Sequence, residues 1–267
     1  MLARYNGLEE KIRKLFSSLD IPNIGFCPFE AVKDRLISCA GLKRLPQNAK
    51  TVICAVFPYK VRNEHPENIS RYGAVPDYHN ICGEMLKRAA ESLKNVFPEN
   101  DFEVFLDNSP IPEVYCASAA GLGVMGKNGL LINKDYGSFV FIGEIVTDLA
   151  LSLTSNQPQP CLNCGKCEAL CPVCLDKERC LSKITQKKGE LTPQEEQLIK
   201  ENGSVWGCDI CAEVCPMNKN AKTTYVDDFI NGYRHRYTEG EDMTGRPYAW
   251  RGEKVIRRNS DLFKGKK

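Results

Sequence analysis

Cysteine spacing constrains this chain more than any other feature of its sequence. Residues 161–172 read Cys-x2-Cys-x2-Cys-x3-Cys-Pro, with cysteines at positions 161, 164, 167 and 171. This spacing is typical of chains that hold two [4Fe–4S] clusters, in which the fourth cysteine binds a different cluster from the first three. The run therefore predicts a module in which two clusters lie close together.

A second, incomplete run follows at residues 208–216, Cys-x2-Cys-x3-Cys-Pro. It has no first cysteine nearby, but Cys180 can supply that thiolate if residues 181–207 are looped out. Cys174 is the alternative and is interpreted as a spare thiol. We predict two ligand sets: Cys161, Cys164, Cys167 and Cys215 for one cluster, and Cys171, Cys180, Cys208 and Cys211 for the other.

The spacing has a physical reason, which is the reach of the chain. Each iron of a cubane needs a deprotonated sulfur, and gaps of two residues wrap one turn of backbone around a cluster, with N–H groups directed at its sulfides. Structural zinc also uses Cys-x2-Cys pairs. Two interlocking halves make zinc a poor alternative here.

Composition limits the remaining choices. The chain has 267 residues, enough for one large domain or two modest ones, and a net charge of +2 neither requires nor excludes nucleic acid as a partner. Residues 1–20 are charged and amphipathic, so we expect no signal peptide. No apolar run reaches the ~18 residues of a membrane span. Eight thiolates committed to clusters predict a reducing cytoplasm, and the other cysteines, at positions 27, 39, 54, 82, 116 and 174, are mostly expected in the core.

Hydrophobic patterning predicts an α+β fold over residues 1–155. Helices are expected over 6–19, 29–38, 79–97 and 112–120, and strands over 51–57, 102–106, 130–133 and 138–147, with a break at Gly25 and Phe26. Pro158 and Pro160 mark the join to the cluster module. We predict three segments: a catalytic domain over 1–155, the cluster domain over 156–222 and a basic tail over 223–267.

The glycine-rich stretch 121–129, Gly-Leu-Gly-Val-Met-Gly-Lys-Asn-Gly, fits Gly-x-Gly-x-x-Gly. A dinucleotide site should follow a strand and open a helix, whereas here a helix precedes and a strand follows. A phosphate loop also fails, because Asn128 stands where a hydroxyl for Mg²⁺ is needed. Two interpretations stay open: a close approach of backbone to a large ligand, or a tightly packed turn.

Two polar sites outside the cysteines are candidates. Residues 77–79, Asp-Tyr-His, approach the cobalamin sequence Asp-x-His-x-x-Gly, but Cys82 occupies the glycine position. His79 is therefore not expected as an axial ligand, and the simpler interpretation is a residue at the start of a helix. Asp107 follows the strand 102–106, where catalytic side chains are often displayed. On its own, such an aspartate more often has a role in a turn or a helix cap.

Several stretches together resemble the epoxyqueuosine reductase family, in the family's order from about residue 50 to 220. The matching stretches are Ser70-Arg-Tyr72 with Asp77-Tyr-His79, Asp107-Asn-Ser-Pro110, Ala120-Gly-Leu-Gly123 with Gly126-Lys-Asn128, Gly137-Ser138 with Gly143-Glu-Ile145, Arg179-Cys-Leu-Ser182, and residues 207–218.

The resemblance implies a cobalamin-binding α/β-sandwich domain followed by a ferredoxin-like domain with two [4Fe–4S] clusters. It implies a base-off cobalamin without a protein axial ligand, a low-potential electron donor of flavodoxin or ferredoxin type, and a tRNA substrate. Asp107 falls on the family's proton-donor position. The implied cobalamin contacts are Tyr78, His79, Asp107, Gly126, Lys127, Asn128, Leu131, Ile142, Ser182 and Asp209.

The chain departs from the family pattern in two places. Residues 73–76 read Gly-Ala-Val-Pro, where family members usually carry arginines that suit RNA phosphate. The chain is also short and lacks the C-terminal helical repeats that some members append. The basic tail from Arg251 is a candidate substitute, although a solvated terminal helix is the commoner meaning of such charges.

Two other functions remain open on the sequence. A reductive dehalogenase-like enzyme acting on a small molecule would share the corrin and the clusters. A non-catalytic electron carrier would keep the clusters, lack the corrin and leave Asp107 with a structural role.

Overall fold

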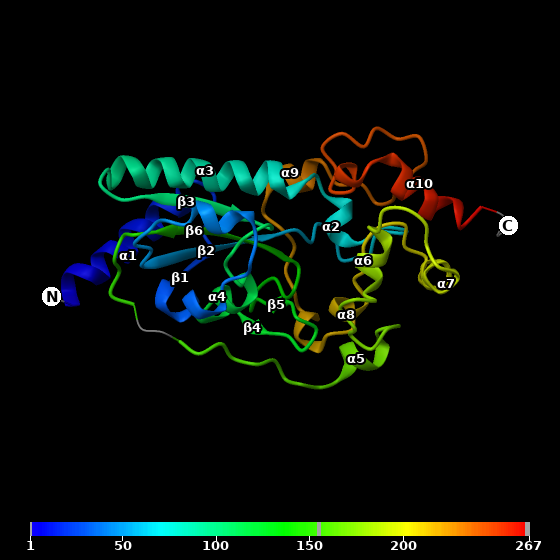
Figure 1. Ribbon diagram of the computed structural model, residues 1–267, viewed down its shortest axis with the longest axis horizontal. Coiled ribbons are helices and arrows are strands. Elements are labelled where there is room, and N and C mark those ends of the chain that lie inside the picture. The colour runs from blue at the N-terminus through cyan, green and yellow to red at the C-terminus, as the bar shows by residue number, and fades with distance from the viewer. Residues whose placement is uncertain (1, 154–155, 265–267) are drawn as a thin grey trace. The chain divides into compact units, whose positions relative to one another are not determined.

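The computed structural model describes residues 2–153 and 156–264 and shows a mixed α/β chain with two compact units (Figure 1). The first unit comprises Met1–Phe57, His79–Lys134 and Val140–Leu162. The second comprises Pro58–Tyr78, Asp135–Phe139 and Asn163–Lys267. The units are interleaved along the chain, whereas the three segments predicted from the sequence are contiguous. Those segments stay a prediction.

A four-stranded sheet forms the centre of the first unit. Its strand order is β1 (Ile24–Pro28), β2 (Thr51–Pro58), β6 (Val140–Thr147) and β3 (Phe102–Leu106). The pairs β1–β2 and β3–β6 are antiparallel, and the Lys50 N–H donates to the Thr147 carbonyl at 2.9 Å, beside the start of β2. The sheet includes the predicted strands 51–57, 102–106 and 138–147.

Helices cover both faces of this sheet. Val52, Cys54 and Val56 of β2 alternate onto one face, where they share a core cluster with residues of α4 (Glu113–Ala119). On the other face runs α3 (Tyr78–Val96), whose Leu86 lies against Gly143 of β6. Every residue of β2 is buried, which agrees with its uninterrupted apolar sequence. The unit also contains α1 (Leu2–Ser17).

The predicted break at Gly25 and Phe26 is wrong, because both lie in β1. A Cβ on Gly25 would sit 2.3 Å from the Ala120 carbonyl oxygen. Glycine here permits close packing of the strand against the end of α4, and it does not end an element. The predicted helix 29–38 is also wrong, because the structure has two short 3₁₀ turns, Phe29–Ala31 and Lys33–Arg35.

The glycine-rich stretch forms a small hairpin. Strand β4 (Val124–Met125) pairs antiparallel with β5 (Leu131–Ile132), and the Gly126 N–H donates to the Leu130 carbonyl at 2.8 Å. A Cβ on Gly123 would lie 2.5 Å from the Ile132 carbonyl oxygen, so this glycine is required by the hairpin's own packing. The predicted strand 130–133 is the second arm of this hairpin.

Short helices make up the second unit. Its α-helices are α2 (Arg71–Ala74), α5 (Lys166–Leu170), α6 (Leu181–Thr185), α7 (Pro193–Asn202), α8 (Ile210–Glu213), α9 (Asp227–Asn231) and α10 (Glu253–Asp261). Thr192 and Glu195 form a capping box at the start of α7. Thus residues 181–207, expected to be looped out, contain two helices.

Buried Arg71 explains why residues 58–78 join the second unit. Its guanidinium donates to the Glu213 carboxylate at 2.5 Å and to the carbonyls of Arg62, Asn63 and Glu64 at 2.7, 2.9 and 3.1 Å. Loss of Glu213 would strongly destabilise the fold, because it would leave the buried Arg71 charge without its carboxylate partner. Nearby, Ile69 forms a parallel bridge with Trp206.

The close approach at Gly25 predicts a stability difference between two glycine variants. Gly25→Ala should lower the free energy of unfolding by about 1–3 kcal/mol, because its Cβ would clash with backbone. Gly83→Ala is the matched control. Its Cβ would meet only Leu106 Cδ2 at 3.8 Å, and alanine favours a helix interior, so stability should rise by about 0.5–1 kcal/mol. Denaturant melts of both variants measure the difference, and equal midpoints would contradict the packing argument.

Candidate functional site

Asp107 stands immediately beyond the end of β3. The last cross-strand pair is Leu106 with Gly143, and Asp107 then takes a left-handed conformation, with φ of 63°. Aspartate tolerates this conformation better than most residues. Its side chain is 64% exposed, and His79 Nε2 lies 3.4 Å from Asp107 Oδ2. The strand end thus presents a carboxyl group to solvent beside an imidazole.

Two further carboxyl groups lie behind Asp107. Burial, and secondarily the charge of Asp107, raise the pKa of Glu113 to about 7. Burial also raises the pKa of Glu144 well above its ordinary value, with a further contribution from Glu113. Glu144 is fully buried and neither carboxyl oxygen has a hydrogen-bond partner. The nearby Ser109 hydroxyl does not reach hydrogen-bond geometry with Glu144 and accepts from the Ile111 N–H at 3.1 Å.

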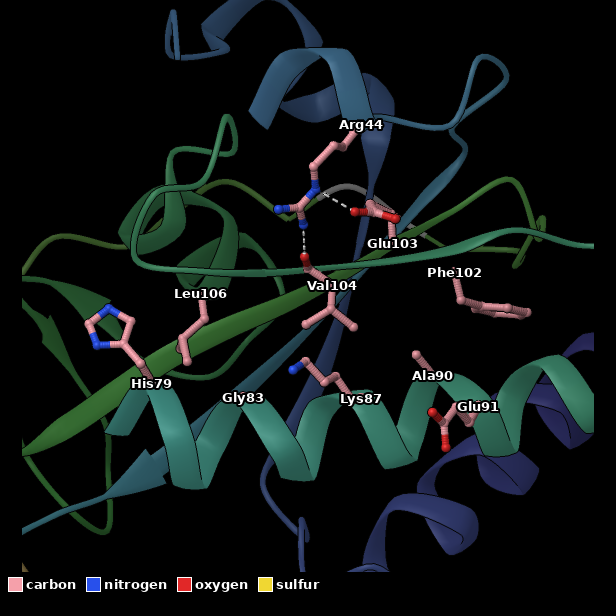
Figure 2. Close-up of a pocket in the computed structure, with 10 residues that line it drawn as sticks. All are labelled: Arg44, His79, Gly83, Lys87, Ala90, Glu91, Phe102, Glu103, Val104 and Leu106. Atoms are coloured by element: carbon pink, nitrogen blue, oxygen red, sulfur yellow. Dashed lines mark hydrogen bonds and ion pairs between the residues drawn. The ribbon is translucent and has the colours of Figure 1, made fainter. Parts of the chain in front are cut away.

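A groove of about 480 Å³ runs between α3 and β3, and His79 and Leu106 lie at its Asp107 end (Figure 2). Arg44 closes one side, where its Nε donates to Glu103 at 2.5 Å and its Nη2 donates to the Val104 carbonyl. Figure 2 shows Lys87 of α3 on the opposite side. The complete lining is Arg44, His79, Gly83, Lys87, Ala90, Glu91, Phe102, Glu103, Val104 and Leu106.

The predicted cobalamin contacts in the first unit fall into two groups. Gly126, Lys127 and Asn128 lie in the turn of the hairpin, and the Lys127 N–H lies 3.4 Å from Cys161 Sγ. Leu131 and Ile142 are 2% and 8% exposed and belong to the core cluster under α4. Any contact of these two residues with a cofactor would have to use mainly their backbone.

The predicted contacts in the second unit already have protein partners. The Asp209 carboxylate accepts from the Arg71 N–H at 2.6 Å and lies 2.9 Å from His65 Nε2. Donation of a hydrogen bond to the Asp209 carboxylate raises the pKa of His65. Ser182 lies in α6, and its Oγ accepts from Gln186 Nε2 at 3.4 Å. Tyr78 is the first residue of α3.

The cysteine runs meet through two short helices. Helix α5, which carries Cys167, packs against α8, which carries Cys211. Asn163 and Gly165 have positive φ angles of 48° and 76°. Such left-handed residues turn backbone N–H groups into a concave anion site of the kind found around iron–sulfur clusters. The predicted cluster ligands themselves stay a prediction.

Cys180 and Cys174 differ in their surroundings. Burial raises the pKa of the Cys208 thiol to about 12, and the nearby charges of Asp209, Cys211 and Cys180 act in the same direction. A thiolate at Cys208 therefore needs a bound cation. The contribution of Cys180 indicates that it lies near Cys208 and Cys211, and the predicted ligand set stays a prediction. Cys174 is exposed.

Within residues 2–153 and 156–264, no three His, Cys, Asp or Glu side chains converge to hold a single metal ion. Cys161 belongs to the first unit, where its N–H donates to the Met125 carbonyl at 3.0 Å. In the same described ranges, no helix is long and apolar enough to cross a membrane.

The basic tail packs against protein and is not a simple solvated extension. Val255 and Ile256 of α10 are buried in a core cluster with Trp206. Arg258 donates to the carbonyls of Lys187 and Gly189 at 2.9 and 2.5 Å. The tail's other cations include Arg257 and Lys264, both paired with Glu239. These pairings reduce the charge available for RNA phosphate.

Sequence reasoning missed Glu113 and Glu144 as functional candidates. Glu144 does carry a recognisable signal, because a charged residue interrupts the apolar strand 140–147. Glu113 lies in a predicted helix, and only its proximity to Asp107 in the fold distinguishes it.

Comparison with known proteins gives a consistent result. A family model described as epoxyqueuosine reductase QueG, DUF1730, matches residues 40–108. The chain is 30% identical to the epoxyqueuosine reductase of Lactococcus garvieae, over 94% of this chain and 85% of the relative. It is 32% identical to that of Escherichia coli, over 84% of this chain and 58% of the relative.

Solved structures share the fold. The epoxyqueuosine reductase of Streptococcus thermophilus superposes with a TM-score of 0.78 at 22% identity, covering 95% of this chain and 80% of that one. An epoxyqueuosine reductase crystallised with an epoxyqueuosine-modified tRNA-Tyr stem loop superposes with a TM-score of 0.81 at 22% identity, covering 97% and 81%.

The contrast between Cys180 and Cys174 predicts different iron contents. After anaerobic reconstitution, Cys180→Ser should lose iron, because one cubane lacks a thiolate ligand. Cys174→Ser should keep the iron content of the wild-type protein and serves as the matched control. Iron and sulfide analysis with visible absorbance measures both. Iron loss in Cys174→Ser alone would reverse the assignment.

The raised pKa of Glu113 predicts a pH-dependent stability. As the pH rises from its ordinary pKa of 4.5 to about 7, the unfolded chain releases a proton that the folded chain keeps. The free energy of unfolding of the wild-type protein therefore falls across this range. Above the folded-state pKa, this loss, the penalty for burying an ionised Glu113, stays constant. Glu113→Gln removes the penalty, so its melting temperature relative to wild type should rise between about pH 5 and about pH 8. A constant difference would contradict the shift.

Proposed function

Because this chain belongs to the epoxyqueuosine reductase family, we propose that it is an oxidoreductase that reduces epoxyqueuosine to queuosine in tRNA. The observation that carries the proposal is relatedness over 94% of the chain, joined to a strand-end carboxyl group at the family's proton-donor position. A structural neighbour supplies the substrate class, since it was crystallised with an epoxyqueuosine-modified tRNA stem loop.

The proposed cluster ligands are those expected from the sequence. Packing of α5 against α8 and the left-handed residues Asn163 and Gly165 fit an anionic cluster. Cys161, Cys164, Cys167 and Cys215 would hold one [4Fe–4S] cluster, and Cys171, Cys180, Cys208 and Cys211 the other. These thiolates favour a reducing compartment, which we propose to be the cytoplasm, with a flavodoxin- or ferredoxin-type donor.

The proposed cobalamin site has no histidine ligand. His79 Nε2 is directed at Asp107, which fits a base-off cofactor without a protein axial ligand. When bound, the reduced cobalamin would supply the electrons for epoxide opening. The hairpin turn 126–128 would support the corrin through its backbone, because Gly126 carries no side chain. Tyr78, Leu131, Ile142, Ser182 and Asp209 complete the proposed contacts.

Asp107 would act as the general acid. An epoxide oxygen leaves as an alkoxide unless it is protonated, and a positioned carboxylic acid removes that barrier. His79 lies close enough to orient the Asp107 carboxyl group. The exposed position at a strand end lets a large substrate such as tRNA reach it.

Substitution of Asp107 tests the proposed acid. Asp107→Asn should lower turnover by about 10²–10⁴-fold while cobalamin and iron are retained. Asparagine accepts positive φ as aspartate does, so the backbone should be preserved. Asp101→Asn, just before the start of β3, is the matched control and should keep full activity. Unchanged turnover in Asp107→Asn would exclude the acid role.

Anaerobic reconstitution tests the function as a whole. Titration with cobalamin should give the electron paramagnetic resonance signal of base-off cob(II)alamin, because His79 Nε2 is directed at Asp107 and the proposed site uses no protein axial ligand. The reduced holoenzyme should then convert epoxyqueuosine in a tRNA stem loop. Full iron content without corrin binding would instead indicate an electron carrier. Corrin binding without tRNA turnover would direct the search to small-molecule substrates.

A further inference from the structure

Removal of an epoxide oxygen needs more protons than one acid holds. Conversion of an epoxide to the alkene breaks both C–O bonds, consumes two electrons and takes up two protons to release water. Asp107 carries one proton. Once a large substrate covers Asp107, bulk water reaches it poorly, so the second proton requires an internal supply.

Glu144 is placed where such a supply could be held. It pairs directly with Phe105 across β3 and β6, and directly opposite residues point to the same face of a sheet. Phe105 and the β6 residues Ile142 and Val146 all belong to the core cluster under α4. Glu144 therefore points into this core, two residues before Asp107 in the register, with no exposure and no hydrogen-bond partner on either oxygen.

An unpartnered buried carboxylate would be very costly, whereas a neutral acid costs far less. The core position therefore favours the protonated form of Glu144, in agreement with the upward shift of its pKa. Glu113, the first residue of α4, lies within electrostatic reach of both Glu144 and Asp107. It is partly buried, on the helix that packs over the core face holding Glu144.

Neutral polar groups lie in or beside this core. They are the thiols of Cys27 on β1, Cys54 on β2 and Cys116 on α4, together with the Ser109 hydroxyl. Cys54 and Cys116 lie 3.4 Å apart, Sγ to Sγ. None of these groups is a cation, and the lowering effect of the Ser109 hydroxyl on the pKa of Glu144 is smaller than the raising effects of burial and of Glu113.

We infer that Glu113 and Glu144 form a proton-supplying pair that reprotonates Asp107 during turnover. The inference rests on the proposed function, which it deepens by assigning a source to the second proton. Both residues act through Asp107, so they are positioning residues that need not touch the substrate.

The proton steps balance. Asp107 gives its proton to the epoxide oxygen as the first C–O bond breaks, and becomes a carboxylate. The Glu113 carboxyl group then transfers its proton to Asp107, and Glu144 or solvent restores Glu113. Asp107 gives the second proton to the hydroxyl group, which leaves as water when the second C–O bond breaks. The external low-potential donor supplies the two electrons.

Isosteric variants of the holoenzyme test the pair. Glu113→Gln and Glu144→Gln should each lower kcat by about 10²-fold, near the lower end of acid–base effects, with KM unchanged. Glu113→Asp keeps the acid and should recover part of the loss. Iron content, cobalamin content and circular dichroism check that the variants fold. The exposed Glu84→Gln on α3 is the matched control and should keep wild-type kcat.

The pH profile separates proton supply from a structural role. Wild-type kcat should fall as the pH rises through about 7, where Glu113 becomes ionised. Glu113→Gln should lose this limb, whereas a merely structural defect would lower kcat at every pH and keep the limb. Wild-type kcat and pH profile in both glutamine variants would overturn the inference.

Infrared spectroscopy gives a readout that needs no turnover. The wild-type protein at neutral pH should show the C=O stretch of protonated carboxyl groups, and this band should lose the Glu144 contribution in Glu144→Gln while the part from Glu113 remains. Absence of the band in the wild-type protein would overturn the inference even if Glu144→Gln does not fold. A present band without turnover of epoxyqueuosine would instead mean that the proposed function fails while the protonated carboxyl is real.

Discussion

The register between β3 and β6 determines the geometry of the candidate site. Pairing of Leu106 with Gly143 ends the ladder at the residue before Asp107, and pairing of Phe105 with Glu144 directs that carboxyl group into the core. A shift by one residue would turn every side chain of β3 to the opposite face. Gly143 contributes as well, because a Cβ there would meet Leu86 of α3 at 2.4 Å. The pairing of β3 with β6 thus determines the positions of Asp107, of the buried Glu144 carboxyl group and of helix α3.

Much of this sheet could be predicted because its strands carry strong local signals. The run 51–57 is continuously apolar and 102–106 is short and bounded by polar residues, so length and composition identify both. Gly25 misled the prediction because its role depends on Ala120, a partner remote in sequence. The assignment of residues 58–78 to the second unit could not be predicted either, because it depends on the ion pair of Arg71 with Glu213, which lies far away in the sequence. Local pattern does not encode such pairings.

The candidate site divides in the same way. Cysteine spacing and the strand-end position of Asp107 are properties of contiguous sequence, so both could be proposed without coordinates. Glu113 and Glu144 are candidates only because the fold brings them to the same core, and this proximity could not be predicted from the sequence. The glycine hairpin lies between these cases. Its glycines were noticed, yet at Gly123 the close approach is to the hairpin's own second strand.

The bridge between Ile69 and Trp206 has a consequence for synthesis of the protein. Residues 58–78 leave the ribosome long before the segment that buries them, with more than a hundred residues still to be made. At about 5–20 residues per second, the wait is roughly 10 s. During that time Arg71 lacks Glu213, and the apolar side chains of this segment lack their cover. The first unit can form its sheet meanwhile. The connection between β2 and α3 stays unfolded until the later segment is made, and it is therefore a binding site for a chaperone during synthesis.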